Sequence, residues 1–329
     1  ILTLAAALAA SVLGGWLARK YSRPVGELVA KADRIRGLDL APQVPAATNV
    51  LELRTLDRAQ DDMRMALDSF SRYVPTEVVR DLLQRGEAAE IGGREQTLSI
   101  LFTDIEGFTS IAEGLSPREL TVHMSAYFEL MVSALREGGA TVDKFVGDAI
   151  VAFWGAPTSD DDHATHALET VLACQERLDA QNARWAAEGK PPLPTRYGLA
   201  TGPVVVGNIG APTRLHYTVL GDTVNLASRL EGANTIYGTR TLVAEGTVEA
   251  AGDAFVFRRI DHVAVKGKRQ ALTVYELLGR PGDVDPEDPR RTLVEAALAL
   301  YQERAFAAAL ARLAPLVESD PAAARLAAR

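Results

Sequence analysis

The first 18 residues contain no charged side chain and are mostly Ala, Leu, Val and Gly, and Arg19, Lys20 and Arg23 follow directly. As an α-helix, this segment would rise about 27 Å, close to the ~30 Å hydrocarbon core of a bilayer. The pattern predicts the end of a transmembrane helix whose basic flank lies on the cytoplasmic side. It therefore predicts an inner or plasma membrane protein whose remaining residues are cytoplasmic. A buried core helix and the apolar part of a signal peptide are the alternatives.

Two amphipathic helices are predicted within residues 19–72. The first starts near Pro24, which suits a first helical turn, and repeats apolar residues at helical spacing: Val25, Leu28, Ala32 and Ile35. The second, from about residue 50, has a stripe with a similar rhythm: Leu53, Leu56, Gln60, Met63, Leu67 and Phe70. Heptad helices of this length form a parallel bundle when a second chain doubles them, so we expect a homodimer. An ordinary hairpin of amphipathic helices is the alternative.

Residues 73–92 are interpreted as a linker, and strand-like and helix-like runs alternate within residues 93–280. Strands are predicted at 97–103, 140–146, 149–154, 196–200, 204–209, 255–265 and 272–277, and helices at 119–137, 162–187 and 223–233. Two strands joined by a tight turn follow the first of these helices. This order indicates an α+β fold and not a doubly wound parallel sheet. The segment contains neither a Walker loop nor a G-x-G-x-x-G motif.

A linker rich in Pro, Gly and Asp covers residues 281–290, and a helical tail covers residues 291–329. Six residues of the tail match the packing positions of a tetratricopeptide-type helix pair: Leu300, Phe306, Ala309, Leu313, Leu316 and Pro321. One repeat of this kind cannot bury its own face. We therefore expect the start of a helical array that binds a protein partner; a plain Ala-rich tail is the alternative.

Composition removes several classes of function. The net charge of −8 argues against nucleic acid as a partner, because that binding relies on basic residues. Cys174 is the only cysteine, which excludes a disulfide scaffold and a cysteine-rich zinc site. Six of the 35 basic residues are lysines, and three of these fall in the motifs below: Lys144, Lys266 and Lys268.

Two aspartates stand where a divalent metal could bind. Asp104 ends an apolar strand, and the chain then turns through Gly107, Phe108 and Thr109 into a helix, where free backbone N–H groups suit phosphate oxygens. Asp148 occupies a tight turn between two apolar strands. If the strands are neighbours, the two carboxylates can hold Mg²⁺ or Mn²⁺ together. Taken singly, each is more simply a cap or a turn residue.

A third motif, TVLGDTVNLASRLEG at residues 218–232, places Asn225 and Arg229 four residues apart on one helical face. An amide beside a guanidinium suits a sugar oxygen and a phosphate. A surface arginine beside a structural asparagine is the alternative.

These motifs occur together in the order of a known family. From about Arg94 to Leu278, the chain resembles the class III nucleotidyl cyclases. The resemblance rests on the motifs LFTDIEGFTS, DKFVGDAIVAFWGAP, TVLGDTVNLASRLE and VKGK. The resemblance implies a ferredoxin-like catalytic domain. The two upstream helices, with Pro24 and Glu52, resemble a HAMP signalling module.

The resemblance also implies roles for individual residues. Asp104, Asp148 and the Ile105 carbonyl match the ligands of two Mg²⁺ or Mn²⁺ ions per site. Lys144 and Thr218 match the two purine-selecting positions, in the Lys–Thr form of a bacterial adenylate cyclase subclass. Asn225 and Arg229 match the residues that stabilise the transition state, and Lys266 matches the phosphate-binding lysine.

The implied function is conversion of ATP to 3′,5′-cyclic AMP and pyrophosphate at sites shared by two chains packed head to tail. One chain would contribute the metal ligands, and its partner would contribute the base-selecting and transition-state residues. A guanylate cyclase and an inactive nucleotide-binding signalling domain are the alternatives.

Overall fold

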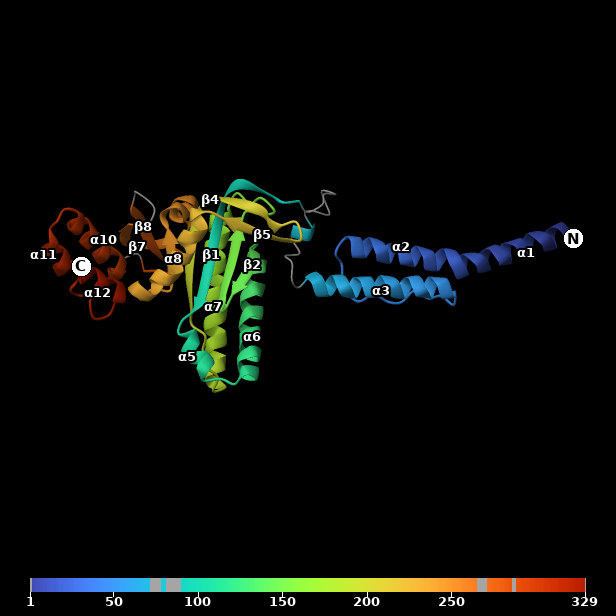
Figure 1. The fold of residues 1–329 in the computed structure, drawn as a ribbon, viewed down its shortest axis with the longest axis horizontal. Helices are drawn as coiled ribbons and strands as arrows, with labels where there is room; N and C mark the ends of the chain where they lie inside the picture. The colour runs from blue at the N-terminus through green and yellow to red at the C-terminus, as the bar shows by residue number, and fades with distance from the viewer. Residues whose placement is uncertain (1, 72–77, 81–89, 265–270, 286–287, 329) are drawn as a thin grey trace. The chain divides into compact units, whose positions relative to one another are not determined.

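The computed structural model describes residues 2–71, 78–80, 90–264, 271–285 and 288–328 (Figure 1). The chain divides into two compact units, residues 1–88 and 89–329. Most of the expected linker at residues 73–92 lies outside the described residues.

The first unit is helical. Helix α1 (Leu2–Leu17) continues through a π-helical turn (Ala18–Ser22) into α2 (Arg23–Arg36), and α3 (Leu51–Ser71) follows. The segment between α2 and α3 runs back along them, so the two helices point the same way (Figure 1). This is the direction expected of a parallel bundle.

The predicted transmembrane helix is not found in the described part of the chain. No helix there is both long enough and apolar enough to cross a membrane. The apolar helix α1 has 16 residues, which rise about 24 Å, and the basic residues Arg19 and Lys20 come next.

The contact between α2 and α3 contains a buried charge cluster. The ammonium group of Lys31, 5% exposed, lies 2.7 Å from a carboxylate oxygen of Asp57 and 2.8 Å from one of Asp61. Asp57 also accepts the backbone N–H of Ala46 at 3.2 Å, which ties the connecting segment to α3. A buried charge is costly without partners, so this cluster favours one alignment of the two helices.

The second unit is built on a mixed sheet. In the described residues the sheet has eight strands: β1 (Gly92–Ile105), β2 (Thr141–Val146), β3 (Ala149–Trp154), β4 (Thr195–Ala211), β5 (Arg214–Leu220), β6 (Thr241–Ala244), β7 (Val256–Ala264) and β8 (Ala271–Gly279). The strand order is β2-β3-β1-β4-β6-β8-β7, and β5 pairs with β4. The pair β4–β6 is parallel and the other pairs are antiparallel.

Helices cover both faces of the sheet (Figure 1). They are α5 (Phe108–Glu113), α6 (Pro117–Glu137), α7 (His163–Ala187), α8 (Asp222–Tyr237) and α9 (Glu245–Ala251). The segment β1-α6-β2-β3-α7-β4, with strand order β2-β3-β1-β4, is the ferredoxin-like arrangement. The α+β prediction is therefore confirmed.

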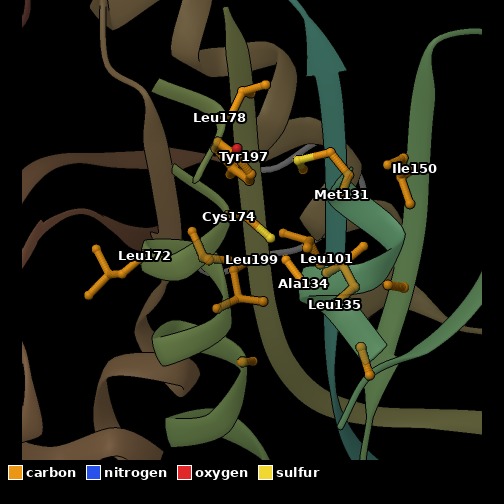
Figure 2. Close-up of a cluster of buried hydrophobic side chains, with 14 of the residues drawn as sticks. Leu101, Met131, Ala134, Leu135, Ile150, Leu172, Cys174, Leu178, Tyr197 and Leu199 are labelled. Carbon is orange, nitrogen blue, oxygen red and sulfur yellow. The ribbon is translucent and has the colours of Figure 1, made fainter. Parts of the chain in front are cut away.

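Side chains of β1 point alternately to the two faces of the sheet, and each face has its own buried core. Leu101 and Ile105 of β1 join the cluster formed with α6, α7 and α9, whereas Leu98 and Ile100 join the cluster formed with α8. Figure 2 shows part of the first cluster, with Cys174 among its aliphatic side chains. Burial raises the pKa of the Cys174 thiol to about 12, which fits a structural role.

Several strand predictions differ from the structure. The strands expected at 196–200 and 204–209 form one strand, because Gly202 and Pro203 stay in register with β1 opposite Leu98 and Thr97. Proline fits an extended backbone, and at Pro203 only β1 pairs with β4, because β6 pairs with residues 197–199 and β5 with residues 205–211. Strands β5 and β6 and helix α9 were not predicted.

The tail belongs to the same unit as the sheet. It forms α10 (Pro289–Gln302), α11 (Phe306–Leu313) and α12 (Pro321–Ala327). Of the six predicted packing residues, Ala309, Leu313 and Leu316 are buried in its own small core, and Leu300 packs against that core. The other two, Phe306 and Pro321, are exposed. Continuation as a repeat array stays a prediction.

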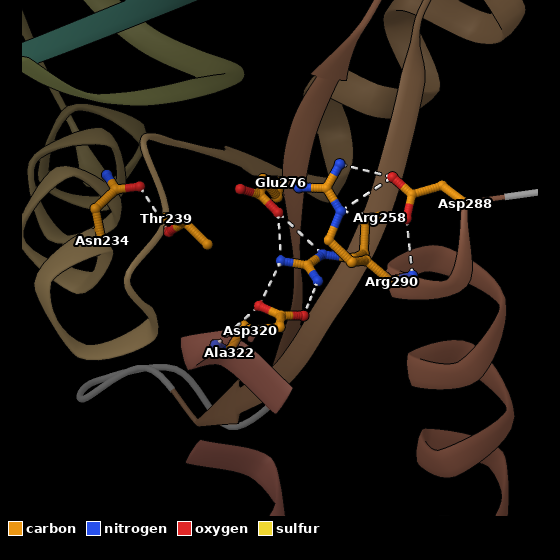
Figure 3. Close-up of polar contacts among 8 residues, drawn as sticks. All are labelled: Asn234, Thr239, Arg258, Glu276, Asp288, Arg290, Asp320 and Ala322. Atoms are coloured by element: carbon orange, nitrogen blue, oxygen red, sulfur yellow. Dashed lines mark hydrogen bonds and ion pairs between the residues drawn. The ribbon is translucent and has the colours of Figure 1, made fainter. Parts of the chain in front are cut away.

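A buried arginine fastens the tail to the sheet (Figure 3). Arg258 of β7 is 2% exposed, pairs with Glu276 of β8 at 2.6 Å and also pairs with Asp320. Asp320 in turn caps α12 by accepting the Ala322 N–H at 3.2 Å. Burial raises the pKa of Glu276, and the charge of Arg258 offsets part of this rise.

Helix α8 approaches β4 so closely that only glycine fits at the contact. A Cβ on Gly198 would lie 2.2 Å from the Ala227 carbonyl oxygen and 2.2 Å from the Glu231 nitrogen. Backbone atoms cannot move aside as a flexible side chain can. The position of α8, which carries Asn225 and Arg229, therefore depends on this residue.

We predict that Gly198→Ala lowers the stability of the second unit by about 1–3 kcal/mol, because α8 must shift to admit the methyl group. The matched control is Gly232→Ala on α8, where an added Cβ meets nothing within 4 Å. That change should leave stability unchanged or raise it by up to about 1 kcal/mol. Urea unfolding of both variants measures the difference, and equal stabilities would contradict the predicted clash.

Candidate active site

Asp104 and Asp148 meet at one end of the sheet. Asp104 is the penultimate residue of β1, and Asp148 follows Gly147 in the turn between β2 and β3. Gly147 has a φ of 66°, a left-handed conformation that glycine adopts without strain. The backbone N–H of Ile105 donates to an Asp148 carboxylate oxygen at 3.1 Å. The two strand ends thus hold both carboxylates beside each other.

The electrostatics of this pair suit a cation. Partial burial raises the pKa of Asp148 first, and the nearby charge of Asp104 raises it further. A divalent cation between them would remove this repulsion, and carboxylate oxygens are hard ligands of the kind that Mg²⁺ and Mn²⁺ prefer. Among the described residues, no group of three or more His, Cys, Asp or Glu side chains could hold a metal. Two carboxylates fit an ion that takes its other ligands from backbone, water or substrate.

Arg196, which sequence reasoning missed, neutralises part of this charge. It lies opposite Asp104 in the β1–β4 pairing and donates from Nη2 to Asp104 at 3.0 Å. Its Nε lies 3.3 Å from Glu231 on α8. Burial, followed by the charge of Asp104, raises the pKa of Glu231 to about 7. No local motif marks Arg196, because its place is set by strand register.

The turn after β1 leads directly into a short helix. Gly107, with a φ of 68°, precedes the short helix α5, and the first N–H groups of a helix have no acceptors within it. Phe108 packs against the core, which anchors the turn, while Thr109 is exposed. The predicted role of these three residues in binding phosphate is compatible with this placement.

Lys144 and Thr218 are in direct contact, although they are 74 residues apart. The Lys144 Nζ donates to the Thr218 hydroxyl oxygen at 3.2 Å. The same hydroxyl donates to Asp143 at 2.7 Å. Burial raises the pKa of Asp143, whereas the hydrogen bond from Thr218 and the charge of Lys144 lower it. Sequence reasoning missed Asp143, although it precedes a selected lysine.

Asn225 and Arg229 lie on the exposed surface of α8, four residues apart, as predicted. Lys266 and Lys268 lie outside the described residues. In the part of the chain that the structure describes, no hydrogen bond or ion pair joins Asp104 or Asp148 to Lys144 or Thr218. One chain thus presents two separate groups of candidate residues.

Comparisons with known proteins identify the family of the second unit. Residues 92–279 match the model of the adenylate and guanylate cyclase catalytic domain. Adenylate cyclase 1 of Rhizobium meliloti (strain 1021) is 40% identical over 263 residues, which cover 80% of this chain and 40% of that protein. The adenylate cyclase of Anabaena cylindrica is 34% identical over 288 residues, which cover 80% of this chain and 56% of that protein. The chain thus spans about half the length of these relatives.

Solved structures of both substrate classes are similar to the catalytic unit. The guanylyl cyclase Cya2 is 35% identical with a TM-score of 0.54, and the match covers 60% of this chain and 98% of that one. The adenylyl cyclase CyaB from P. aeruginosa is 32% identical with a TM-score of 0.54, and the match covers 59% and 100%. Overall similarity therefore does not separate the two substrates, and individual side chains must.

We predict that Asp148→Asn lowers the affinity for Mn²⁺ by at least about tenfold, because it removes one of two charged ligands. Without metal, the same change should raise the melting temperature. The raised pKa of Asp148 means that the folded state disfavours its charged form. The charged carboxylate therefore lowers the free energy of unfolding, and this loss grows as the pH rises from about 4 to neutral.

Paramagnetic resonance titration with Mn²⁺ and thermal unfolding in EDTA at pH 4 to 8 measure the two effects. Asp160→Asn is the control, because Asp160 pairs with His166 at 2.8 Å and belongs to neither candidate group. Unchanged Mn²⁺ affinity in Asp148→Asn would contradict the metal site.

Proposed function

Since this chain belongs to the adenylate and guanylate cyclase catalytic-domain family, we propose that it is an adenylate cyclase that converts ATP to 3′,5′-cyclic AMP and pyrophosphate. The contact between Lys144 and Thr218 carries the proposal. A lysine ammonium can donate to the adenine ring N1, and a threonine hydroxyl can accept from the adenine amino group. Guanine presents a ring N–H and a carbonyl at these positions, which would leave the protein groups unpaired.

Each candidate group has a part in the reaction. The ribose 3′-oxygen attacks the α-phosphorus, and pyrophosphate leaves. Asp104, Asp148 and the Ile105 carbonyl would hold the metal ions, which when bound lower the cost of the forming alkoxide and screen the phosphates. The turn at Gly107, Phe108 and Thr109 receives phosphate oxygens through its N–H groups.

Charge that develops at the α-phosphoryl group is met by the Arg229 guanidinium, and Asn225 on the same face of α8 orients the ribose. Lys266 completes the phosphate contacts, as its motif predicts.

We predict that Lys144→Glu combined with Thr218→Cys lowers kcat/KM for ATP by at least about tenfold, because each new group mismatches adenine. Gain of activity on GTP is the weaker expectation, since pocket packing also matters. Product formation from ATP and GTP, followed for the parent and the variant, provides the test. A parent that prefers GTP, or that turns over neither nucleotide with Mg²⁺ or Mn²⁺, would contradict the proposed function.

The two groups of residues would meet in a homodimer. Lys144 and Asp148 are four residues apart in one hairpin, yet they are assigned to opposite ends of an extended nucleotide. In a head-to-tail dimer, Asp104 and Asp148 of one chain would face Lys144, Thr218, Asn225, Arg229 and Lys266 of the other. Large apolar side chains near Lys144 and Thr218 support a partner there, because they are 42–57% exposed in one chain: Phe145, Val146, Val205 and Leu220.

We predict that Asp104→Ala and Asn225→Ala chains are each nearly inactive alone and recover activity when mixed. A heterodimer would contain one intact site and one doubly damaged site, so activity should reach at most about half that of the parent per dimer. Differently tagged chains, co-purified through both tags before the assay, establish that heterodimers form. Purified heterodimers without activity would contradict the shared site.

The first unit would act as a HAMP-like signalling module. Two parallel helices with a returning connector support this proposal (Figure 1). The partly exposed stripe of α3 supports it as well. Within one chain α2 leaves three residues of that stripe, spaced by seven, 48–66% exposed: Leu56, Met63 and Phe70. A second copy would cover them and form a four-helix bundle.

We predict that Met63→Lys weakens dimerisation of the full chain by at least about tenfold, because it places a charge in the shared seam. Met65→Lys is the matched control, since Met65 is also 49% exposed but lies off the stripe. Sedimentation equilibrium gives both dissociation constants, and equal values would refute the seam.

A further inference from the structure

Asp143 lies beneath the two residues assigned to base selection. Its side chain is 4% exposed, whereas that of Lys144 is 49% exposed. One of its oxygens, Oδ2, accepts the Thr218 hydroxyl at 2.7 Å and lies 3.3 Å from the Lys144 Nζ. With the 3.2 Å bond between Lys144 and Thr218, the three side chains form a closed triangle.

A β-bulge makes this triangle possible. Neighbouring residues of a regular strand point to opposite faces, so Asp143 and Lys144 could not both reach Thr218. The β2–β3 register shifts at this place: Val142 pairs with Ala152 and Lys144 with Val151, which leaves Asp143 as the extra residue. Bulges re-aim side chains in this way and are frequent beside active sites.

The hydrogen atoms of the triangle fix what it can recognise. A hydroxyl has one hydrogen and two lone pairs, and an ionised carboxylate only accepts. Since Asp143 takes the Thr218 hydrogen and Lys144 donates to one lone pair, the remaining lone pair of Thr218 can only accept. The ammonium, after donating to Thr218 and Asp143, keeps one hydrogen for a ligand. The triangle therefore offers one acceptor and one donor, which matches an amino group beside an unprotonated ring nitrogen.

We propose that Asp143 is a specificity-determining positioning residue, which makes adenine the preferred base by fixing the Thr218 hydroxyl as an acceptor and the Lys144 ammonium as a donor. The inference rests on the proposed function, in which ATP is the substrate. Asp143 itself does not touch the nucleotide and acts through its two neighbours.

The test compares ATP with purine riboside triphosphate, which lacks the 6-amino group, and with GTP. The parent should use ATP at least about tenfold better than purine riboside triphosphate, as expected for a lost hydrogen bond to a buried acceptor. In Asp143→Asn, the new amide can donate to Thr218 and free its hydroxyl to donate. The ratio of kcat/KM between the two nucleotides should then fall to about threefold or less, and the preference over GTP should also shrink.

A double-mutant cycle shows whether Asp143 acts through Thr218. In a Thr218→Val background, Asp143→Asn should change the ratio no further, because no hydroxyl remains to be oriented. Asp160→Asn is the control for loss of a paired carboxylate elsewhere, and it should keep the parent ratio.

The outcomes separate this inference from the proposed function. A parent without ATP turnover or ATP preference contradicts the proposed function. In that case, the inference is tested by binding. The 3′-deoxy forms of ATP and purine riboside triphosphate cannot cyclise, so the ratio of their dissociation constants measures the preference for the 6-amino group directly. An ATP-selective parent whose Asp143→Asn variant keeps its ratio, even with lower kcat, overturns the inference and makes Asp143 a structural carboxylate. Asp143→Ala is a second variant in case Asp143→Asn does not fold. If neither variant unfolds cooperatively, the inference that Asp143 is a positioning residue is overturned as well.

Discussion

The pairing of β1 with β4 is the constraint on which the catalytic unit depends. The two strands stay in antiparallel register from Gly92 opposite Asn208 to Ile105 opposite Thr195. Because β1 alternates between two buried faces, a shift by one residue would exchange the side chains of both cores. The register therefore fixes the helices on each face and, at its far end, sets Asp104 opposite Arg196.

Helix α8 carries Asn225 and Arg229, the two residues proposed to stabilise the transition state. Gly198 lets the backbone of α8 approach β4, while Ala227 and Leu230 are buried on the same side. Asn225 and Arg229 therefore face outward from a helix whose inner side cannot move closer or turn. Rigid support of this kind is what a residue that stabilises a transition state requires.

Buried charges recur where two elements must meet in one arrangement. Lys31 joins α2 to α3, Arg196 joins the end of β1 to α8, and Arg258 joins the sheet to the tail. Such clusters add little net stability, since desolvation offsets much of the attraction. An apolar contact tolerates sliding, whereas a buried charge that loses its partner is strongly disfavoured. The clusters thus contribute alignment more than stability.

The sequence by itself determined the α+β class, the main helices and the local settings of the key residues. Strand ends and turns are marked by the residues next to them in the sequence. The position of Asp104 at a strand end and that of Asp148 in the turn after Gly147 could therefore be predicted directly. The same holds for Asn225 and Arg229, whose spacing on a helix needs no partner.

Only the tertiary structure decided which distant residues meet. The place of Arg196 follows from strand register, and the place of Asp143 from a bulge, and neither has a signature among its neighbours in sequence. Strand β5 was not predicted, although Tyr217, Thr218 and Val219 favour a strand. Its place beside β4 is set by pairing between the two strands. Local preferences act over one or two turns, but register, bulges and close approaches depend on hydrogen bonds and packing between segments far apart in the chain.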